Sequence, residues 1–199
     1  MKRNGILFKH GVLNANEVMI DYLKDNQRRL KRVMDEINDS CLHWKSAPDA
    51  NSIAVTLWHM GRLLDVFLTQ QANGEPSEHE SWFRCGWAQQ TRYDPRGLGQ
   101  NGWGAVVGYT IAEAAAIPRF TREQVLGYLD DVYSAASTYI QNTPMAELAE
   151  AAPGFEGRYT KYQVLSMAIL DNVRHLGEIY TIKAMWGRTR QRTNLTPDP

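Results

Sequence analysis

Apolar residues recur at intervals of three and four along four stretches of the chain, which is the spacing of one face of an α-helix. These stretches cover residues 15–38, 51–71, 121–143 and 160–186. Asn51 or Ser52 can cap the second stretch, Thr121 and Gln124 match a capping box at the third, and Gly187 is a stop signal after the fourth. Alternating runs typical of strands are few, although residues 105–109 are a candidate for a short extended piece. We therefore predict an all-α fold.

A long segment, residues 72–120, separates the second and third predicted helices. Loops of this length inside a compact domain are usually functional or disordered, and the aromatic residues here favour an ordered crossover. Because such a connection can travel the length of a bundle, the two helices it joins can point the same way. The pattern predicts a single domain over residues 1–199, an up-down-down-up four-helix bundle with a long crossover between helices 2 and 3.

Two sets of side chains in this crossover each have two interpretations. The aromatic residues either wall a substrate pocket or cover apolar helix surface. The arginines either recognise a carboxylate-bearing ligand, such as a low-molecular-weight thiol, or are solvated. The aromatic residues are Trp82, Trp87, Trp103 and Tyr109, and the arginines are Arg84, Arg92 and Arg96.

Charge and hydropathy argue against two classes of partner. The 22 Lys and Arg residues balance the 22 Asp and Glu residues, so the chain lacks the broad positive field that drives nucleic-acid binding. No segment approaches the roughly 20 apolar residues of a membrane helix, and the basic start of the chain lacks the apolar core of a signal peptide. We expect a cytoplasmic protein that acts on a small molecule, without nucleic-acid or membrane partners.

Candidate chemistry gathers in the second and fourth predicted helices. Asp171 and His175 are four residues apart, so in a helix they share one face and interrupt an otherwise apolar row. His59 is a histidine in the other long apolar stretch and lies beside its apolar stripe. Buried charge is costly unless it is paired or bound to metal, and two imidazoles with one carboxylate suit a divalent ion with open positions for water and substrate. We predict His59, Asp171 and His175 as metal ligands.

A simpler interpretation needs no ion. His175 then hydrogen-bonds Asp171 one turn back, and His59 is a core histidine that a backbone carbonyl or a water satisfies. Glu178, three residues after His175, either orients an imidazole or is a solvated helix residue. Spacing alone leaves these alternatives open.

Three segments carry a family resemblance: residues 50–59, residues 116–129 and residues 175–187, which begin His-Leu-Gly-Glu-Ile. Together with the long crossover, they resemble the DinB-like superfamily of bacterial four-helix bundles over nearly the whole chain. The resemblance implies a divalent metal, often zinc or nickel, with His59 as the first ligand and His175 as the last. It also implies a tendency to form homodimers.

This chain departs from the family pattern at one position, because Asp171 stands where a histidine is usual. A carboxylate in the set widens the expected metals to iron or manganese. Some members of the family are thiol-dependent S-transferases or isomerases that use mycothiol, bacillithiol or glutathione. The resemblance therefore implies a metal-dependent transferase that joins a small thiol to an electrophile.

Two other functions stay open. A metal-dependent hydrolase would share the same ligands but activate water instead of a thiol. A metal-free bundle would bind a small molecule or a partner protein, with Asp171 and His175 as a buried polar pair. No catalytic residue beyond the metal ligands is assigned from the sequence.

Overall fold

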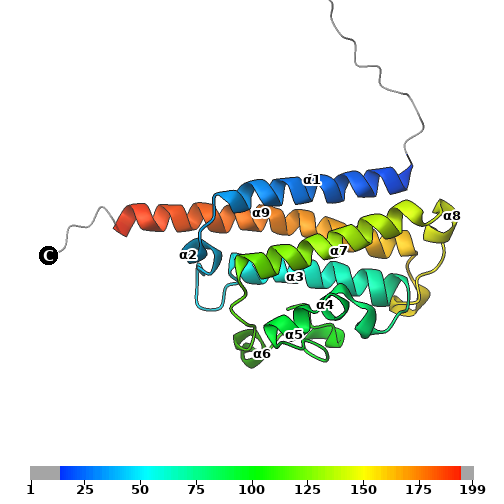
Figure 1. Cartoon of the computed structure of the whole chain (residues 1–199), viewed down its shortest axis with the longest axis horizontal. Helices are drawn as coiled ribbons and strands as arrows, with labels where there is room; N and C mark the ends of the chain where they lie inside the picture. Colours follow the sequence, from blue (N-terminus) through cyan, green and yellow to red (C-terminus); the bar gives the residue numbers. More distant parts are fainter. Residues whose placement is uncertain (1–13, 194–199) are drawn as a thin grey trace, which may run out of the picture.

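The computed structural model of the chain describes residues 14–193. Four long helices dominate it, and Figure 1 shows that two of them run in one direction, α1 and α9, and two in the other, α3 and α7. Helix α3 packs against α7 and α9, and α1 packs against the same two helices. The long helices are α1 (Ala15–Asp35), α3 (Ile53–Val66), α7 (Arg122–Asn142) and α9 (Lys161–Thr193).

The all-α prediction is confirmed for residues 14–193. Residues 105–109, a candidate extended piece, instead form a bend and turn in which Val106 has a φ of 71°. Within residues 14–193, Ala151 and Thr160 form an isolated antiparallel β-bridge. None of the helices between residues 14 and 193 has the length and apolar character that crossing a membrane requires.

Capping residues explain where the long helices begin. The Ser52 side chain accepts a hydrogen bond from the Val55 amide at the start of α3, and Thr121 and Gln124 form the expected capping box at the start of α7. Two predicted ends were wrong. Helix α1 stops at Asp35 rather than at residue 38, and α9 continues through Gly187 to Thr193.

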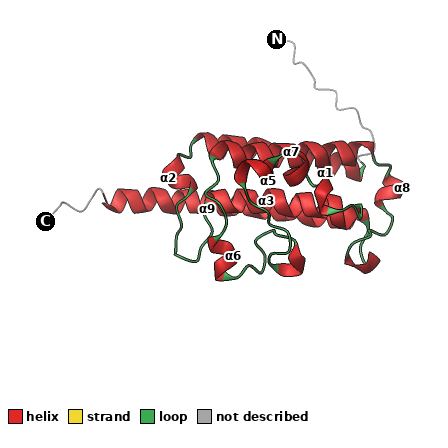
Figure 2. Ribbon diagram, turned by 60° about the horizontal axis from the view of Figure 1, so that its bottom comes forward, coloured by secondary structure: helices red, strands yellow, loops and turns green. Residues whose placement is uncertain are grey.

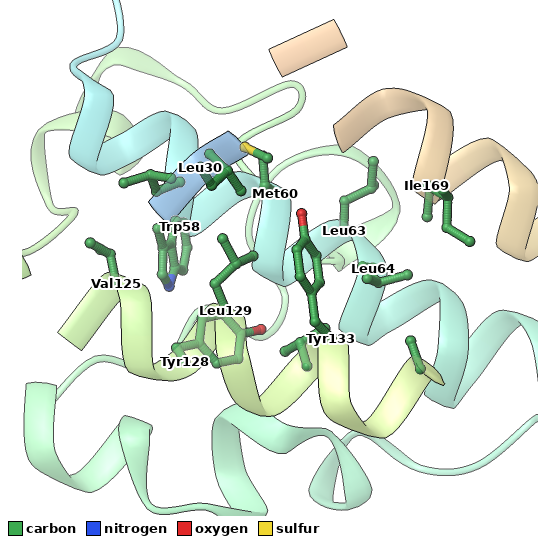
Figure 3. Close-up of a cluster of buried hydrophobic side chains, with 14 of the residues drawn as sticks. Leu30, Trp58, Met60, Leu63, Leu64, Val125, Tyr128, Leu129, Tyr133 and Ile169 are labelled. Atoms are coloured by element: carbon green, nitrogen blue, oxygen red, sulfur yellow. The ribbon is translucent and has the colours of Figure 1, made fainter. Parts of the chain in front are cut away.

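Helix α3 lies at the centre of the molecule, since every one of its residues except Val55 is buried. A helix that is apolar nearly all round must be covered on all sides. Figure 3 shows its side chains meeting those of the neighbouring long helices, such as Leu129 and Tyr133 of α7. The helix continues as a π-helical turn, η1 (Phe67–Ala72).

The crossover supplies the remaining cover of α3 and is made mostly of short helical turns along one side of the bundle (Figures 1 and 2). Its aromatic rings pack on the bundle: Trp82 contacts Trp58 and Tyr128 edge-on, and Trp103 contacts Phe67. The turns of the crossover are η2 (Ser77–His79), α4 (Ser81–Arg84), α5 (Trp87–Thr91), η3 (Gln100–Gly102) and α6 (Ile111–Ala115). The other short helices are α2 (Asp39–Leu42), α8 (Met145–Leu148) and η4 (Phe155–Gly157).

Candidate metal centre

His59 projects from the middle of α3 and is only 7% exposed. Its Nδ1 lies 2.5 Å from the carbonyl oxygen of Ala105 in the crossover, so Nδ1 carries a proton and donates it. This hydrogen bond turns the other ring nitrogen, Nε2, toward α9. There Nε2 lies 3.3 Å from Oδ2 of Asp171.

Helix α9 presents Asp171 and His175 on one face, as their four-residue spacing predicts. Nε2 of His175 lies 3.4 Å from the same Oδ2 of Asp171. Nδ1 of His175 donates to Oε2 of Glu178 at 2.5 Å, and Oε1 of Glu178 accepts from the Thr56 hydroxyl of α3 at 3.5 Å. The Glu178 carboxylate therefore orients His175 and links it to α3.

The two imidazole rings meet edge to face, with centroids 4.6 Å apart and planes at 80°. Each ring has an acceptor on Nδ1 and directs Nε2 toward one carboxylate oxygen. Outer acceptors of this kind fix the tautomer and orientation of histidines that bind metals. The same pattern occurs here on both histidines, one satisfied by backbone and one by a side chain.

The electrostatics of the site couple the carboxylates to the imidazoles. Partial burial opposes ionisation of Asp171, but its interactions with His175 and His59 outweigh burial and hold the pKa of Asp171 well below its usual value. Hydrogen bonds to Asp171 and Glu178 raise the pKa of His175 to about 9. The hydrogen bond from His175 also lowers the pKa of Glu178. Without an ion, His175 is therefore an imidazolium at neutral pH.

The donor set fits a divalent cation. One ligand atom from each of His59, Asp171 and His175 lies within 4.8 Å of the others. Bonds of 2.0–2.2 Å at a tetrahedral angle separate neighbouring ligand atoms by about 3.4 Å, which matches the 3.3 and 3.4 Å between each imidazole and Asp171. Two imidazoles and a carboxylate suit zinc and other first-row metals.

A cavity of about 310 Å³ opens beside these three side chains. Apolar side chains make most of its remaining wall, and the amide of Asn51 adds one further polar group. The apolar residues are Leu63 of α3 with Val106 and Val107 of the crossover. Val106 holds a left-handed backbone conformation that is a genuine outlier for a β-branched residue. The cavity suits a small substrate with an apolar part.

The structure brings together all three residues that the sequence singled out, and it assigns Glu178 to the orienting role. The crossover arginines lie elsewhere. Arg96 pairs with Asp94 and Glu78 on the surface, and Arg84 lines a separate cavity of about 500 Å³. Of the described residues that line the His59 cavity, none is an arginine. The interpretation of these arginines as thiol-carboxylate ligands of this cavity is therefore not supported.

The crossover aromatics cover the bundle rather than wall this cavity. Trp82 is buried among other rings, and Trp87 donates from its indole to Asp131 of α7. Trp103 packs on Phe67, and Tyr109 lies beside Tyr93. The side chains that do wall the cavity from the crossover, the valines at 106 and 107, carry no sequence signature of a site.

Sequence reasoning also missed a buried ionic network next to His59. Arg62 and Asp65 of α3 and Glu80 of the crossover are each no more than 1% exposed. Arg62 pairs with Glu80 at 2.6 Å, and Asp65 accepts from the amides of Ser81 and Trp82. The sequence does contain a sign of this network, because the opposite charges of Arg62 and Asp65, three residues apart, interrupt an otherwise apolar stretch.

Comparisons with known proteins agree with this fold. A sequence model described as the DinB superfamily matches residues 22–179. A solved structure titled as the conserved protein of locus from Enterococcus faecalis superposes with a TM-score of 0.71 at 17% identity, over 86% of this chain and 96% of that chain. That likeness shows the fold alone. No curated protein matches the chain.

Proposed function

Because the chain belongs to the DinB superfamily, whose members are generally metal-binding, we propose that it is a metal-dependent enzyme on an up-down-down-up four-helix bundle. His59, Asp171 and His175 hold one divalent cation. The observation that carries this proposal is the convergence of two Nε2 atoms on Oδ2 of Asp171 at 3.3 and 3.4 Å, with both Nδ1 atoms already bonded to acceptors.

The donor set favours zinc or nickel, and the carboxylate of Asp171 extends the range to iron or manganese. Three protein ligands leave room for a further ligand from the cavity side, which is the arrangement of catalytic rather than structural sites. The charge of the ligand set, one carboxylate and two neutral imidazoles, leaves a bound divalent cation with a net positive charge. That charge favours an anionic fourth ligand.

The proposed reaction transfers a low-molecular-weight thiol to a small electrophile. When bound, the cation acts as a Lewis acid that lowers the pKa of the thiol. The thiol proton leaves to solvent, a sulfur–carbon bond forms on the electrophile, and the leaving group departs with the electron pair of the broken bond. Leu63, Val106 and Val107 hold the apolar part of the substrate and exclude water, while Ala105 and Glu178 keep the two imidazoles in place.

Elemental analysis of protein purified without added metal tests the proposal. We expect about one equivalent of a first-row metal in the parent protein and its loss in His59→Ala and in His175→Ala. His79→Ala is the matched control, because His79 is an exposed histidine that pairs with Glu75 away from the cavity. A parent protein without metal that also takes up no zinc or nickel would refute the assignment.

Activity assays with and without a thiol cosubstrate separate the transferase from a hydrolase with the same ligands. Turnover that requires the thiol supports the transferase. Turnover of an ester or amide by water alone, at the same metal content, supports the hydrolase.

A metal-free binding bundle is the second candidate, and one observation favours it. The polar side chains already have partners without an ion, since Asp171 and Glu178 both accept from His175 and His59 donates to the Ala105 carbonyl. Under this alternative, small organic compounds raise the melting temperature, and zinc, nickel and chelators leave it unchanged.

A further inference from the structure

Arg62 is a fully buried arginine that lies close to His59 on α3 and has no part in the chemistry proposed above. Nη1 donates to Oε2 of Glu80 at 2.6 Å. Nη2 donates to the carbonyl of Trp103 at 3.0 Å, and Nε donates to the carbonyl of Gly104 at 3.4 Å. The guanidinium therefore joins α3 to the beginning and to the later part of the crossover.

The two carbonyls that Arg62 holds come directly before the carbonyl that His59 holds. Trp103, Gly104 and Ala105 thus present three successive carbonyl oxygens to two side chains of one helix. We call residues 103–107 the clamp segment. Its far end is also fixed, because the Val107 carbonyl accepts from the Gln100 amide at 2.8 Å.

The backbone of the clamp segment is held in a conformation that its sequence does not favour. Val106 has a φ of 71°, and a β-branched residue adopts such an angle only when its surroundings impose it. Gly104 has a φ of 62°, and a Cβ added there would lie 2.2 Å from the carbonyl oxygen of Pro95. The segment is therefore packed tightly against Pro95 and is also bound by Arg62.

Stability alone is a weak reason for burying this arginine. Replacing a buried ion pair by apolar residues of similar volume is often neutral or stabilising. What a guanidinium supplies is a planar, rigid set of donors that fixes several acceptors at once. Here those acceptors are Glu80 and the two carbonyls beside Ala105, so what the arginine adds is positional precision in the clamp segment.

We propose that Arg62 is a positioning residue for the metal centre: by holding the carbonyls of Trp103 and Gly104, it places the Ala105 carbonyl that orients His59. The inference rests on the proposed function. Arg62 touches neither metal nor substrate and acts on metal affinity through the backbone of the crossover.

The test compares Arg62→Lys with a matched control, Tyr128→Phe. Tyr128 belongs to the same buried network, because its hydroxyl donates to Oδ2 of Asp65 at 3.0 Å, but it does not contact the clamp segment through that bond. Zinc affinity is measured by competition with a chromophoric chelator, and melting of both metal-free variants shows the loss of stability. We expect at least a tenfold weaker affinity in Arg62→Lys, the usual effect of losing an outer-shell partner, and an unchanged affinity in Tyr128→Phe.

Gly104→Ala provides a second perturbation that leaves Arg62 and Glu80 intact. The added methyl group would collide with Pro95 and displace the clamp segment. We expect a similar loss of zinc affinity. If Arg62→Lys does not fold, this variant decides the question.

A readout on the metal-free protein separates this inference from the proposed function. The Nδ1 proton of His59, bonded to Ala105, should give a protected ring resonance by proton–nitrogen NMR, present in the parent and in Tyr128→Phe. Its loss in Arg62→Lys and in Gly104→Ala supports the positioning role even if the parent binds no zinc, which would refute only the proposed function. Retention of the resonance or of full zinc affinity in both variants overturns the inference, as does an equal loss of affinity in Tyr128→Phe.

Discussion

Metal binding at this site should release a proton from His175, so the apparent zinc affinity should rise with pH. Asp171 and Glu178 raise the pKa of His175 to about 9 from an ordinary 6.5. At pH 7 only about one molecule in a hundred then carries the neutral imidazole that coordination requires. Displacing this proton costs about 2.7 kcal/mol of zinc binding free energy at pH 7, from two pKa units at 1.36 kcal/mol each.

The expected profile is an apparent affinity that increases about tenfold per pH unit between pH 7 and 8.5 and levels off above pH 9. Chelator competition at pH 6.5, 7.5 and 8.5 measures the slope, and calorimetry in two buffers of different ionisation enthalpy counts the protons released. Glu178→Gln removes the negative charge of one of the two side chains that raise the pKa of His175. The slope between pH 7.5 and 8.5 should therefore flatten in that variant.

The stability of the metal-free protein should change in the opposite direction. A histidine whose pKa is raised on folding stabilises the fold fully below its unfolded value and loses that contribution as pH rises through its folded value. The urea midpoint of the metal-free protein should thus fall between about pH 6.5 and pH 9. Equal zinc affinity at pH 6.5 and 8.5, with no proton released, would refute this account of His175.

Three further measurements test the structure. Arg62→Met should lower the free energy of unfolding in urea by about 3–5 kcal/mol, because it leaves Glu80 buried without its cation. The double variant with Glu80→Leu should recover much of that loss. Equal stability of the single and double variants would contradict the pairing. Gly187→Ala should stabilise the protein by about 0.5–1 kcal/mol, because the glycine lies inside α9 with open space around it. In contrast, Gly61→Ala should destabilise the protein by about 1–3 kcal/mol, because the new Cβ would lie 2.6 Å from the Tyr128 ring. Zinc at a hundred times its Kd should stabilise the parent by about 2.7 kcal/mol, and a chelator should reverse the shift in melting temperature; a zinc-insensitive melting curve would argue against a native-state site.

Much of the helical framework could be predicted because local signals agreed with the packing. The capping box at Thr121 gave the start of α7, and Ser52 gave the start of α3. Gly187 did not end the helix as predicted, because a glycine inside a long helix costs only about 1 kcal/mol, which neighbouring residues of α9 can offset. The end of α1 was predicted too late because Asn38 caps the next short helix, α2.

The sequence predicted the metal-ligand side chains of the candidate site but not the backbone features that orient them. The spacing of Asp171 and His175 placed them on one face of α9, and the apolar surroundings of His59 pointed it inward. The acceptor that orients His59 is the backbone carbonyl of Ala105, 46 residues away. Because every residue has a backbone carbonyl, no residue type marks this acceptor in the sequence. The left-handed backbone of Val106, which shapes the cavity, likewise has no signature in a β-branched residue.

The long sequence separations within the centre make it a late product of folding. His59 meets Ala105 across 46 residues and Asp171 across 112 residues, and contacts of such range close slowly because the intervening chain must first lose its freedom. A chain in which α3 and α9 had formed but the crossover had not yet docked would lack the Ala105 carbonyl that turns His59 toward its partners. High-affinity cation capture would therefore report a completed fold, and an ion encountered earlier would find only scattered, weak donors.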